Sequence, residues 1–234
     1  MGKIVLFLLS ILFIAGCGEA AEAEVVDEIL ENINEVNNYE LEITTNVPEN
    51  EAEDIYFMEI DMENSQGVIG IDTVESYDED LIEMYYDREN VYGKAQEGKW
   101  FNIRMSVEEA QSMFFTDYEV IARVLEFMES KEETVFEEAT DSYDFSYQTA
   151  NEGEVTAFMD KWGFNSEDDP INEIAVHYQV NESTYFLEKV HLELMINDED
   201  GQQNKIIHEL HYKNINELPD IEIPEGIENE QLHS

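Results

Sequence analysis

Apolar residues recur at every second position along two long parts of this chain, and this period limits the possible folds more than any other feature. From residue 39 to 47, Tyr39, Leu41, Ile43 and Val47 alternate with polar residues. Such alternation predicts a strand with one buried and one wet face. Further strand-like segments lie at 55–62, 67–74, 81–86, 91–95, 100–103, 143–147, 171–180, 184–196 and 205–214. Short strands joined by polar turns predict an antiparallel sheet.

Several of these segments carry apolar residues on both faces. In 55–62, Tyr56, Met58, Ile60 and Met62 share one face, whereas Phe57 points the other way. A strand that is apolar on both sides has both sides covered. We therefore expect helices to cover one face of the sheet, while the other cover could be a cavity. Residues 218–224 are expected to be extended and to pack along the sheet.

Four segments have helical spacing instead. Residues 25–36 repeat apolar side chains every three or four positions, and so do 106–115, 118–128 and 152–162. Ser106 and Glu109 form a capping-box pattern at the start of the second segment. Two helices placed between two groups of strands do not follow the rhythm of a parallel βαβ fold. The chain is predicted to be an α+β protein whose helices cross over one sheet.

The charge is extreme, with 57 acidic and 11 basic residues and a formal net charge of −46. Hydrophobic residues still make up 43% of the chain, so a disordered polymer is excluded and a folded core in an acidic shell is expected. Nucleic acid is excluded as a partner, because phosphate binding requires clustered lysine and arginine. The acidic shell fits either adaptation to a saline or alkaline habitat, which we favour, or the capture of cations.

The first residues resemble a secretion signal. Lys3 precedes an apolar run from Ile4 to Ile14, which is too short to span a bilayer. The sequence Ile14-Ala15-Gly16-Cys17 resembles the lipobox of bacterial lipoproteins, in which the cysteine receives a diacylglycerol and the chain is cut just before it. An ordinary signal peptide with an incidental cysteine is the alternative. Since Cys17 is the only cysteine, its lipidation leaves none for a disulfide or a thiolate metal site.

The resulting organisation has four parts. We expect a lipoprotein signal peptide at 1–16, a lipid-anchored tether at 17–24, a single domain at 25–227 and a frayed tail at 228–234. The anchor would place the domain on the extracytoplasmic face of the cell membrane.

The order of these features is similar to that of a known family. It runs from the lipobox and one amphipathic helix to Asn38-Tyr39-Glu40-Leu41, then to Met84-Tyr85-Tyr86 with Gly98-Lys99-Trp100, and closes at Ile221-Glu222-Ile223-Pro224. This pattern resembles Gram-positive lipoproteins whose domain is similar to the LolA/LolB/LppX carriers. The resemblance implies a curved antiparallel half-barrel with helices covering its concave face, and acyl chains held between the two.

The residues that such a ligand would contact form an apolar set with several flexible methionines. The same set could equally fill an ordinary core between sheet and helices. The candidates are Tyr56, Met58, Ile60, Met62, Ile69, Ile71, Met84 and Tyr86 on strands, with Met113, Phe114 and Phe115 on the covering helices.

The sequence contains little evidence for a catalytic or metal-binding site. His208 and His211 are three residues apart in a strand-like segment, whereas a zinc-protease helix needs histidines four apart. His177, His191 and His211 could share one face of neighbouring strands and are weak candidates for zinc or copper. The sequence contains no nucleophile elbow, phosphate loop or dinucleotide fingerprint.

These observations together predict a non-enzymatic, lipid-anchored envelope protein with no cofactor. It would bind a lipid or another apolar ligand between sheet and helices, and its membrane contact would be the diacylglycerol on Cys17. The alternative is an interaction or sensory module with a filled core, whose outer face docks a protein partner.

Overall fold

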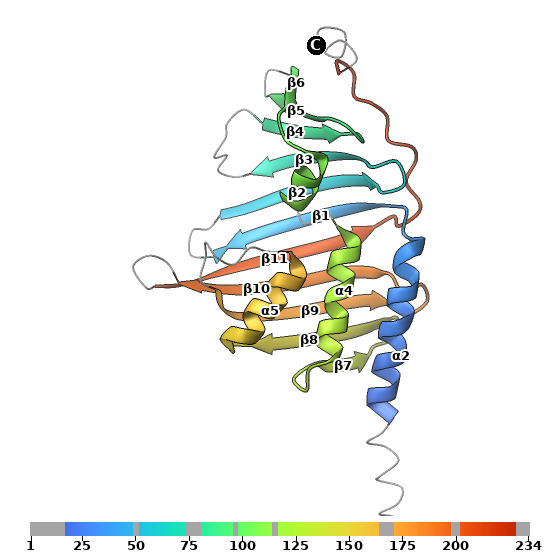
Figure 1. Cartoon of the computed structure of the whole chain (residues 1–234), viewed down its shortest axis with the longest axis vertical. Helices are drawn as coiled ribbons and strands as arrows, with labels where there is room; N and C mark the ends of the chain where they lie inside the picture. Colours follow the sequence, from blue (N-terminus) through green and yellow to red (C-terminus); the bar gives the residue numbers. More distant parts are fainter. Residues whose placement is uncertain are drawn as a thin grey trace, which may run out of the picture.

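The strands form one continuous antiparallel sheet in the computed structural model (Figure 1). The structure describes residues 17–48, 52–73, 81–95, 98–113, 117–163, 171–197 and 202–227. Within these ranges the order across the sheet is β6-β5-β4-β3-β2-β1-β11-β10-β9-β8-β7, so that β6 and β7 are its two edges. The strands are β1 (Asn38–Val47), β2 (Ala52–Asp61), β3 (Gln66–Thr73), β4 (Leu81–Tyr86), β5 (Val91–Ala95), β6 (Trp100–Ile103), β7 (Val135–Glu138), β8 (Ser142–Thr149), β9 (Ile171–Asn181), β10 (Leu187–Asn197) and β11 (Gln203–Lys213).

Two meanders make up this sheet, and the first and last strands of the domain join them. Strands β1 to β6 follow one another in space as in sequence, and so do β7 to β11. The junction is the antiparallel pair of β1 and β11, in which Leu41 lies opposite Tyr212 and Ile43 opposite Leu210. All four of these side chains are buried, so the same apolar face continues from one meander into the other.

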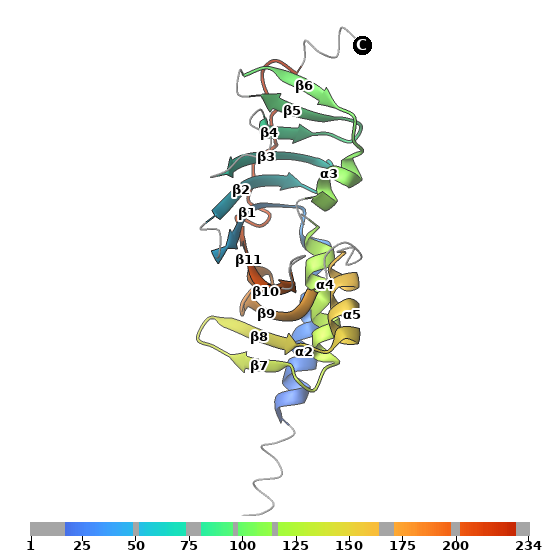
Figure 2. The same ribbon diagram turned by 90° about the vertical axis from the view of Figure 1, so that its left-hand side faces the viewer.

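The helices all lie on one side of the sheet, which we call the inner face (Figure 2). In Figure 1, α2 (Cys17–Asn32), α4 (Tyr118–Glu129) and α5 (Glu152–Trp162) lie across the half of the sheet formed by β7 to β11. The short helix α3 (Val107–Met113) lies higher, beside the other half. The predicted α+β class with an antiparallel sheet and helices on one face is confirmed.

Local signals account for the helix ends. Asp117 caps α4 by accepting a hydrogen bond from Val120 N, and Asn151 caps α5 in the same way through two backbone N–H groups. Gly163 ends α5 in the left-handed conformation, with φ of 87°, that glycine adopts without strain. The predicted capping box is confirmed, since Ser106 N donates to Glu109 at 2.7 Å and Glu109 N donates to the Ser106 hydroxyl at 3.1 Å.

The first helix differs from the prediction. It begins at Cys17, not Val25, so residues 18–24, where we expected the tether, are part of the helix. Alanine and glutamate, which dominate 18–24, are strong helix formers, and acidic residues in the first turns favour the helix dipole. The regular α-helix ends at Asn32, and a 3-10 turn, η1 (Ile33–Glu35), completes the expected span.

The main core fills the space between the inner face and the helices. It is one cluster of buried residues that runs from Val91 and Met84 to Phe145 and Val180. A second, smaller core lies on the opposite, outer face. There Tyr85, Tyr92 and Trp100 pack against Ile221 and Ile227 of the segment that follows β11. The prediction that this last extended segment packs along the sheet is therefore confirmed, and it explains why the strands at this end are apolar on both sides.

Candidate functional site

The predicted ligand-lining residues on β2, β3 and β4 come together on the inner face. Met58, Ile60, Ile69, Met84 and Tyr86 are all buried, with exposed fractions of at most 3%, and belong to the main core. The register explains this grouping. Met58 lies opposite Ile69, which in turn lies opposite Met84. Three neighbouring strands thus place an isoleucine between two methionines in one row.

The remaining candidates on strands occupy the margin of this surface. Tyr56 lies opposite Ile71, and both are partly buried against the core. Met62 differs from the prediction, because β2 ends at Asp61 and Met62 begins the following turn with 36% of its surface exposed. The side chains of Met113, Phe114 and Phe115 lie outside the described residues.

Gly67 leaves room for the Tyr86 ring on this surface. It lies directly opposite Tyr86, whose ring crosses the position that a side chain at residue 67 would occupy. A Cβ atom built there would lie 2.5 Å from both Cζ and Oη of Tyr86. The absence of a side chain at Gly67 therefore leaves room for the tyrosine ring over β3, where it is fully buried.

The Tyr86 hydroxyl is a polar group within this apolar surface. Burial raises the pKa of Tyr86 to about 12, and the nearby Gln111 side chain of α3 partly opposes that rise. The hydroxyl is consequently neutral at every physiological pH. The Tyr86 hydroxyl lies near α3 through Gln111. Ala110 of the same helix is completely buried.

The two halves of the inner face have different covers. Where α4 begins, three tyrosines from different elements form a cluster: Tyr118 of α4 lies 5.7 Å from Tyr39 of β1 and 5.2 Å from Tyr212 of β11 between ring centroids. The Tyr118 hydroxyl accepts a hydrogen bond from Leu187 N at 2.8 Å, and that of Tyr178 donates to Ile121 O at 3.0 Å. These contacts hold α4 against β9, β10 and β11. Over β2 to β4, α3 is the only helix among the described residues, and it has seven residues.

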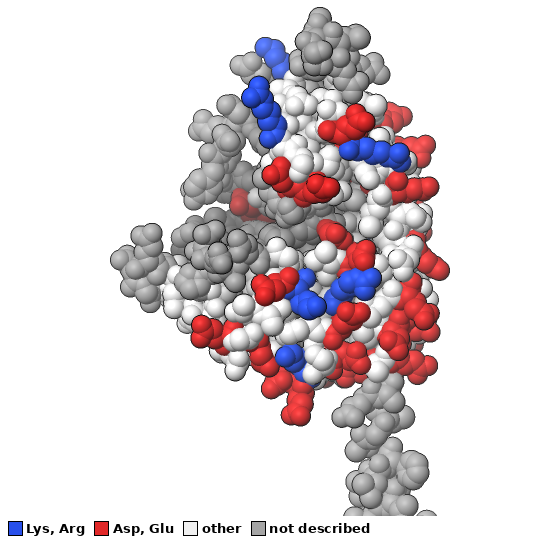
Figure 3. Space-filling model, viewed as in Figure 1, with Lys and Arg blue, Asp and Glu red and all other residues white. Residues whose placement is uncertain are grey.

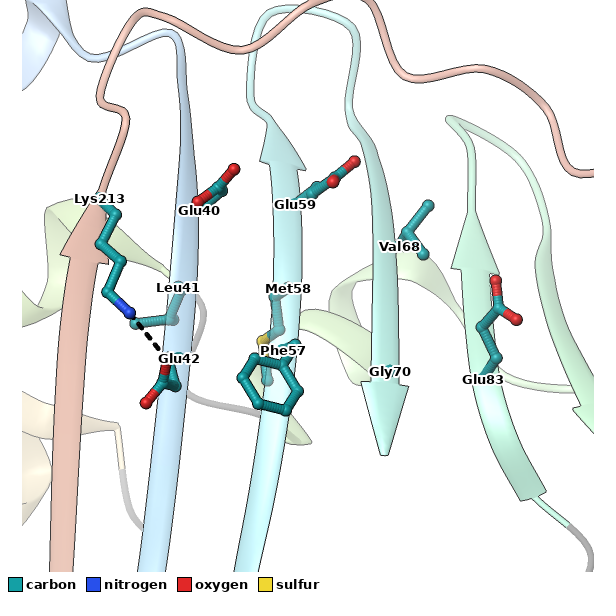
Figure 4. Close-up of a pocket in the computed structure, with 10 residues that line it drawn as sticks. All are labelled: Glu40, Leu41, Glu42, Phe57, Met58, Glu59, Val68, Gly70, Glu83 and Lys213. Atoms are coloured by element: carbon teal, nitrogen blue, oxygen red, sulfur yellow. Dashed lines mark hydrogen bonds and ion pairs between the residues drawn. The ribbon is translucent and has the colours of Figure 1, made fainter. Parts of the chain in front are cut away.

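A hollow of about 330 Å³ lies on the outer face, and sequence reasoning did not find it. Figure 4 shows side chains from β1, β2, β3, β4 and β11 around it. Within it, Gly70 lies opposite both Phe57 and Glu83 and contributes no side chain between them. The register decides this arrangement, so no local pattern could have shown it. The residues that line it are Glu40, Leu41, Glu42, Phe57, Met58, Glu59, Val68, Gly70, Glu83 and Lys213.

The histidines on the outer face are paired with carboxylates. His177 and His191 lie opposite each other on β9 and β10, as a shared face requires. His177 Nε2 lies 3.3 Å from Asp144, while the two ring nitrogens of His191 lie 3.0 Å from Glu209 and 3.2 Å from Glu193. His211 Nε2 lies 3.7 Å from Glu209. Within the described part of the chain, no group of three or more histidine, cysteine, aspartate or glutamate side chains is arranged to hold a metal ion.

The predicted anchor residue, Cys17, is the first residue of α2. The signal segment before it lies outside the described residues. None of the helices that the structure describes is both long and apolar enough to cross a membrane. In Figure 3, acidic side chains follow the side of the molecule that α2 occupies in Figure 1, and Asp27, Glu28 and Glu31 of this helix are exposed.

Comparison with one solved structure supports the fold. LprF from Mycobacterium bovis superposes with a TM-score of 0.53 at 11% identity, over 88% of this chain and 97% of that one. An uncharacterized conserved protein from Thermus thermophilus (7% identity, 86% and 95% coverage) and a DUF1329 family protein from Desulfovibrio piger (9%, 88% and 95%) give TM-scores of 0.31 and 0.30. No curated protein matches the sequence. Residues 21–231 match a family of unknown function, and the chain belongs to that family, DUF6612.

Proposed function

We propose that this protein is a non-enzymatic, lipid-anchored component of the cell envelope that holds an apolar ligand, such as an acyl chain, between the inner face of β2 to β4 and α3. One observation carries the proposal. Met58, Ile69 and Met84 form a continuous apolar row on the half of the sheet that α3 alone overlies among the described helices. The other half is sealed by three longer helices and their tyrosine contacts.

The chemistry of this surface suits a chain-like apolar ligand. Methionine is unbranched and flexible, so two methionines beside Ile69 adapt to ligands of different shape. Binding sites for apolar ligands combine a hydrophobic lining with a few placed polar groups. The neutral Tyr86 hydroxyl and the Gln111 side chain would be those groups, facing an ester or hydroxyl at one end of the ligand.

The shortness of α3 provides a route of entry. A helix of seven residues buries few side chains, and its only fully buried residue among those described is Ala110. Moving it away from the sheet therefore costs little compared with moving α4, which buries six residues. We propose that α3 moves aside to admit the ligand.

The anchor would hold this surface near its source of ligand. An α-helix rises about 1.5 Å per residue, so Cys17 and Val25, which are eight positions apart, are separated by roughly 12 Å along the helix. Val25 and Val26 are already buried in the core, and the helix therefore continues rigidly into the domain. A lipid on Cys17 would keep the domain within a few nanometres of the bilayer.

The alternative function, docking of a protein partner, needs a contiguous apolar patch. Among the described residues, the large apolar side chains that are most exposed lie on separate elements: Phe57 on β2, Phe101 on β6, Val135 on β7 and Ile223 after β11. This scatter favours ligand binding as the main function.

Lipid mass spectrometry tests the proposal. The full chain would be extracted from its native membrane with a mild detergent, and bound lipids would be identified after removal of free lipid. We expect a lipid to copurify with the wild type and to be lost from Met84→Phe, which enlarges a side chain in the proposed site. Met128→Phe is the matched control, because Met128 is equally buried but belongs to α4, which covers the other half of the sheet.

Two results would contradict the proposal. Wild-type protein that carries no more lipid than Met84→Phe would indicate a filled core. Equal loss of lipid from both phenylalanine variants, each with a wild-type circular dichroism spectrum, would place the lipid elsewhere.

A further inference from the structure

The hollow on the outer face has an apolar floor that the chain itself leaves uncovered. Phe57 is 50% exposed although it is a large aromatic residue in the middle of a strand. Its cross-strand neighbour Gly70 offers no side chain to pack against it. A Cβ atom at Gly70 would approach only the Phe57 carbonyl oxygen, at 3.7 Å, so the space beside the ring is open. Val68, which is partly buried, continues this floor along β3 (Figure 4).

The rim of the hollow is acidic. Glu40 of β1 lies directly opposite Glu59 of β2, and like charges in that position destabilise a sheet. Lys213 lies opposite Glu40 in the register, but its ammonium group contacts Glu42 at 2.7 Å instead. Across the described residues, neither Glu40 nor Glu59 has a basic side chain within ion-pair distance.

The remaining carboxylate of the rim is already paired. Glu83 of β4 binds the Lys94 ammonium group at 2.6 Å. The uncompensated charge is therefore concentrated on the β1–β2 side, next to the exposed phenyl ring. A ligand that matches the hollow carries a positive group at that side and an apolar body beside it.

We propose that this hollow binds a small organic cation, with its ammonium or guanidinium group between Glu40 and Glu59 and its apolar body against Phe57, Val68 and Gly70. The volume of about 330 Å³ falls at the lower end of the range of about 300–1,000 Å³ that is usual for small-molecule sites. An inorganic ion would gain nothing from the apolar floor, and a neutral or anionic ligand would gain nothing from the rim. This site lies on the opposite face from the proposed lipid site, so either proposal can be wrong without affecting the other.

Ligand-observed fluorine NMR tests the site with 4-fluorobenzylammonium as the probe. The full-length chain would be held in nanodiscs of zwitterionic lipid, and empty nanodiscs would provide the blank. We expect the Kd of the ammonium probe to be at least tenfold lower than that of 4-fluorobenzyl alcohol, which has the same apolar body. Methylammonium, which lacks that body, should not displace the probe.

Three variants locate the binding. The double variant Glu40→Gln/Glu59→Gln should raise the Kd of the ammonium probe at least tenfold. Gly70→Val fills the hollow without changing the charge and should also abolish binding. The double variant Glu129→Gln/Glu132→Gln removes the same number of charges from exposed positions at the end of α4 and in the next turn, and its Kd should stay within twofold of the wild type.

Three outcomes would overturn the proposal. Equal loss of affinity in the control pair and the rim pair would mean diffuse attraction by the acidic shell. Unchanged binding to a folded Gly70→Val variant would place the probe outside the hollow. Equal affinity for the alcohol and the ammonium probe would show that the charge is not recognised. If Gly70→Val does not fold, covalent labelling by 4-azidobenzylammonium shows where the probe binds. Peptides from β2 or β3 should carry the label, and a label confined to other peptides would overturn the proposal.

Discussion

The substitution Gly67→Ala tests the packing of the inner face most directly. Gly67 and Tyr86 lie opposite each other on β3 and β4, and the tyrosine ring occupies the space over the glycine. A methyl group at residue 67 would lie 2.5 Å from Tyr86 Cζ and Oη, well inside van der Waals contact. Tyr86 is fully buried, so its ring cannot swing into solvent. Either the ring or the strand must move.

The size of the effect follows from these contacts. Adding a methyl group to a well-packed core costs about 1–3 kcal/mol of the free energy of unfolding. Gly70→Ala provides the matched control on the same strand, because its Cβ atom would make only an ordinary contact of 3.7 Å. Replacing an unstrained glycine with alanine stabilises a protein by roughly 0.4–1 kcal/mol through the unfolded state. This gain is common to both variants, so they should differ by the overpacking cost alone, about 1–3 kcal/mol.

Urea unfolding followed by tryptophan fluorescence measures this difference, because Trp100 and Trp162 are both buried. The ionic strength should be held constant, since a net charge of −46 makes the stability depend on salt. In a chain of this size, about 1 kcal/mol shifts Tm by roughly 2–4 °C, so the two melting temperatures should lie roughly 2–12 °C apart.

A double-mutant cycle identifies the cause. On a Tyr86→Ala background the ring is gone, and Gly67→Ala should cost less than about 0.5 kcal/mol. If Gly67→Ala and Gly70→Ala are equally stable, the ring of Tyr86 does not lie over β3. A penalty that persists without the ring would assign the effect to the backbone of β3 and refute the packing argument.

Three further predictions concern a buried hydroxyl, a partly buried imidazole and the proposed anchor. Tyr118→Phe leaves the Leu187 N–H without its acceptor and should lower the free energy of unfolding by about 1–3 kcal/mol in urea titrations. Tyr212→Phe is the control, because it removes a buried hydroxyl that has no partner among the described atoms. It should cost less than about 0.5 kcal/mol. Burial lowers the pKa of His208 to about 4, below its unfolded value of about 6.5, so its contribution is present above pH 6.5 and is lost as the pH falls towards 4. The difference in stability between wild type and His208→Gln should shrink over that interval, and an NMR titration that gives a pKa near 6.5 would contradict the burial. Cys17→Ser should abolish fatty-acid labelling and move the protein from the membrane fraction to the medium; a variant that stays on the membrane would reveal a contact other than the anchor.

Local patterns in the sequence determined most of the secondary structure. The period of two identified the long strands, and the Ser106–Glu109 box correctly placed the start of α3. The same period predicted that Met58 and Ile60 share a buried face, because alternate side chains of a strand point the same way whatever the strand pairs with. Met62 was misplaced, since the pattern does not show that β2 ends at Asp61. The helical start at Cys17 was missed because a short polar stretch lacks the apolar spacing that indicates a packed helix.

The pairing between distant strands was decided only by the tertiary structure. Nothing near β1 in the sequence indicates that it pairs with β11, some 170 residues away, as Leu41 does with Tyr212. The outer hollow depends on the same kind of information, because Phe57, Gly70 and Glu83 are neighbours only in one register of β2, β3 and β4. A strand's own residues determine which side chains share a face. Which residue lies opposite each of them is fixed by the packing of the whole sheet, and both proposed sites depend on that register.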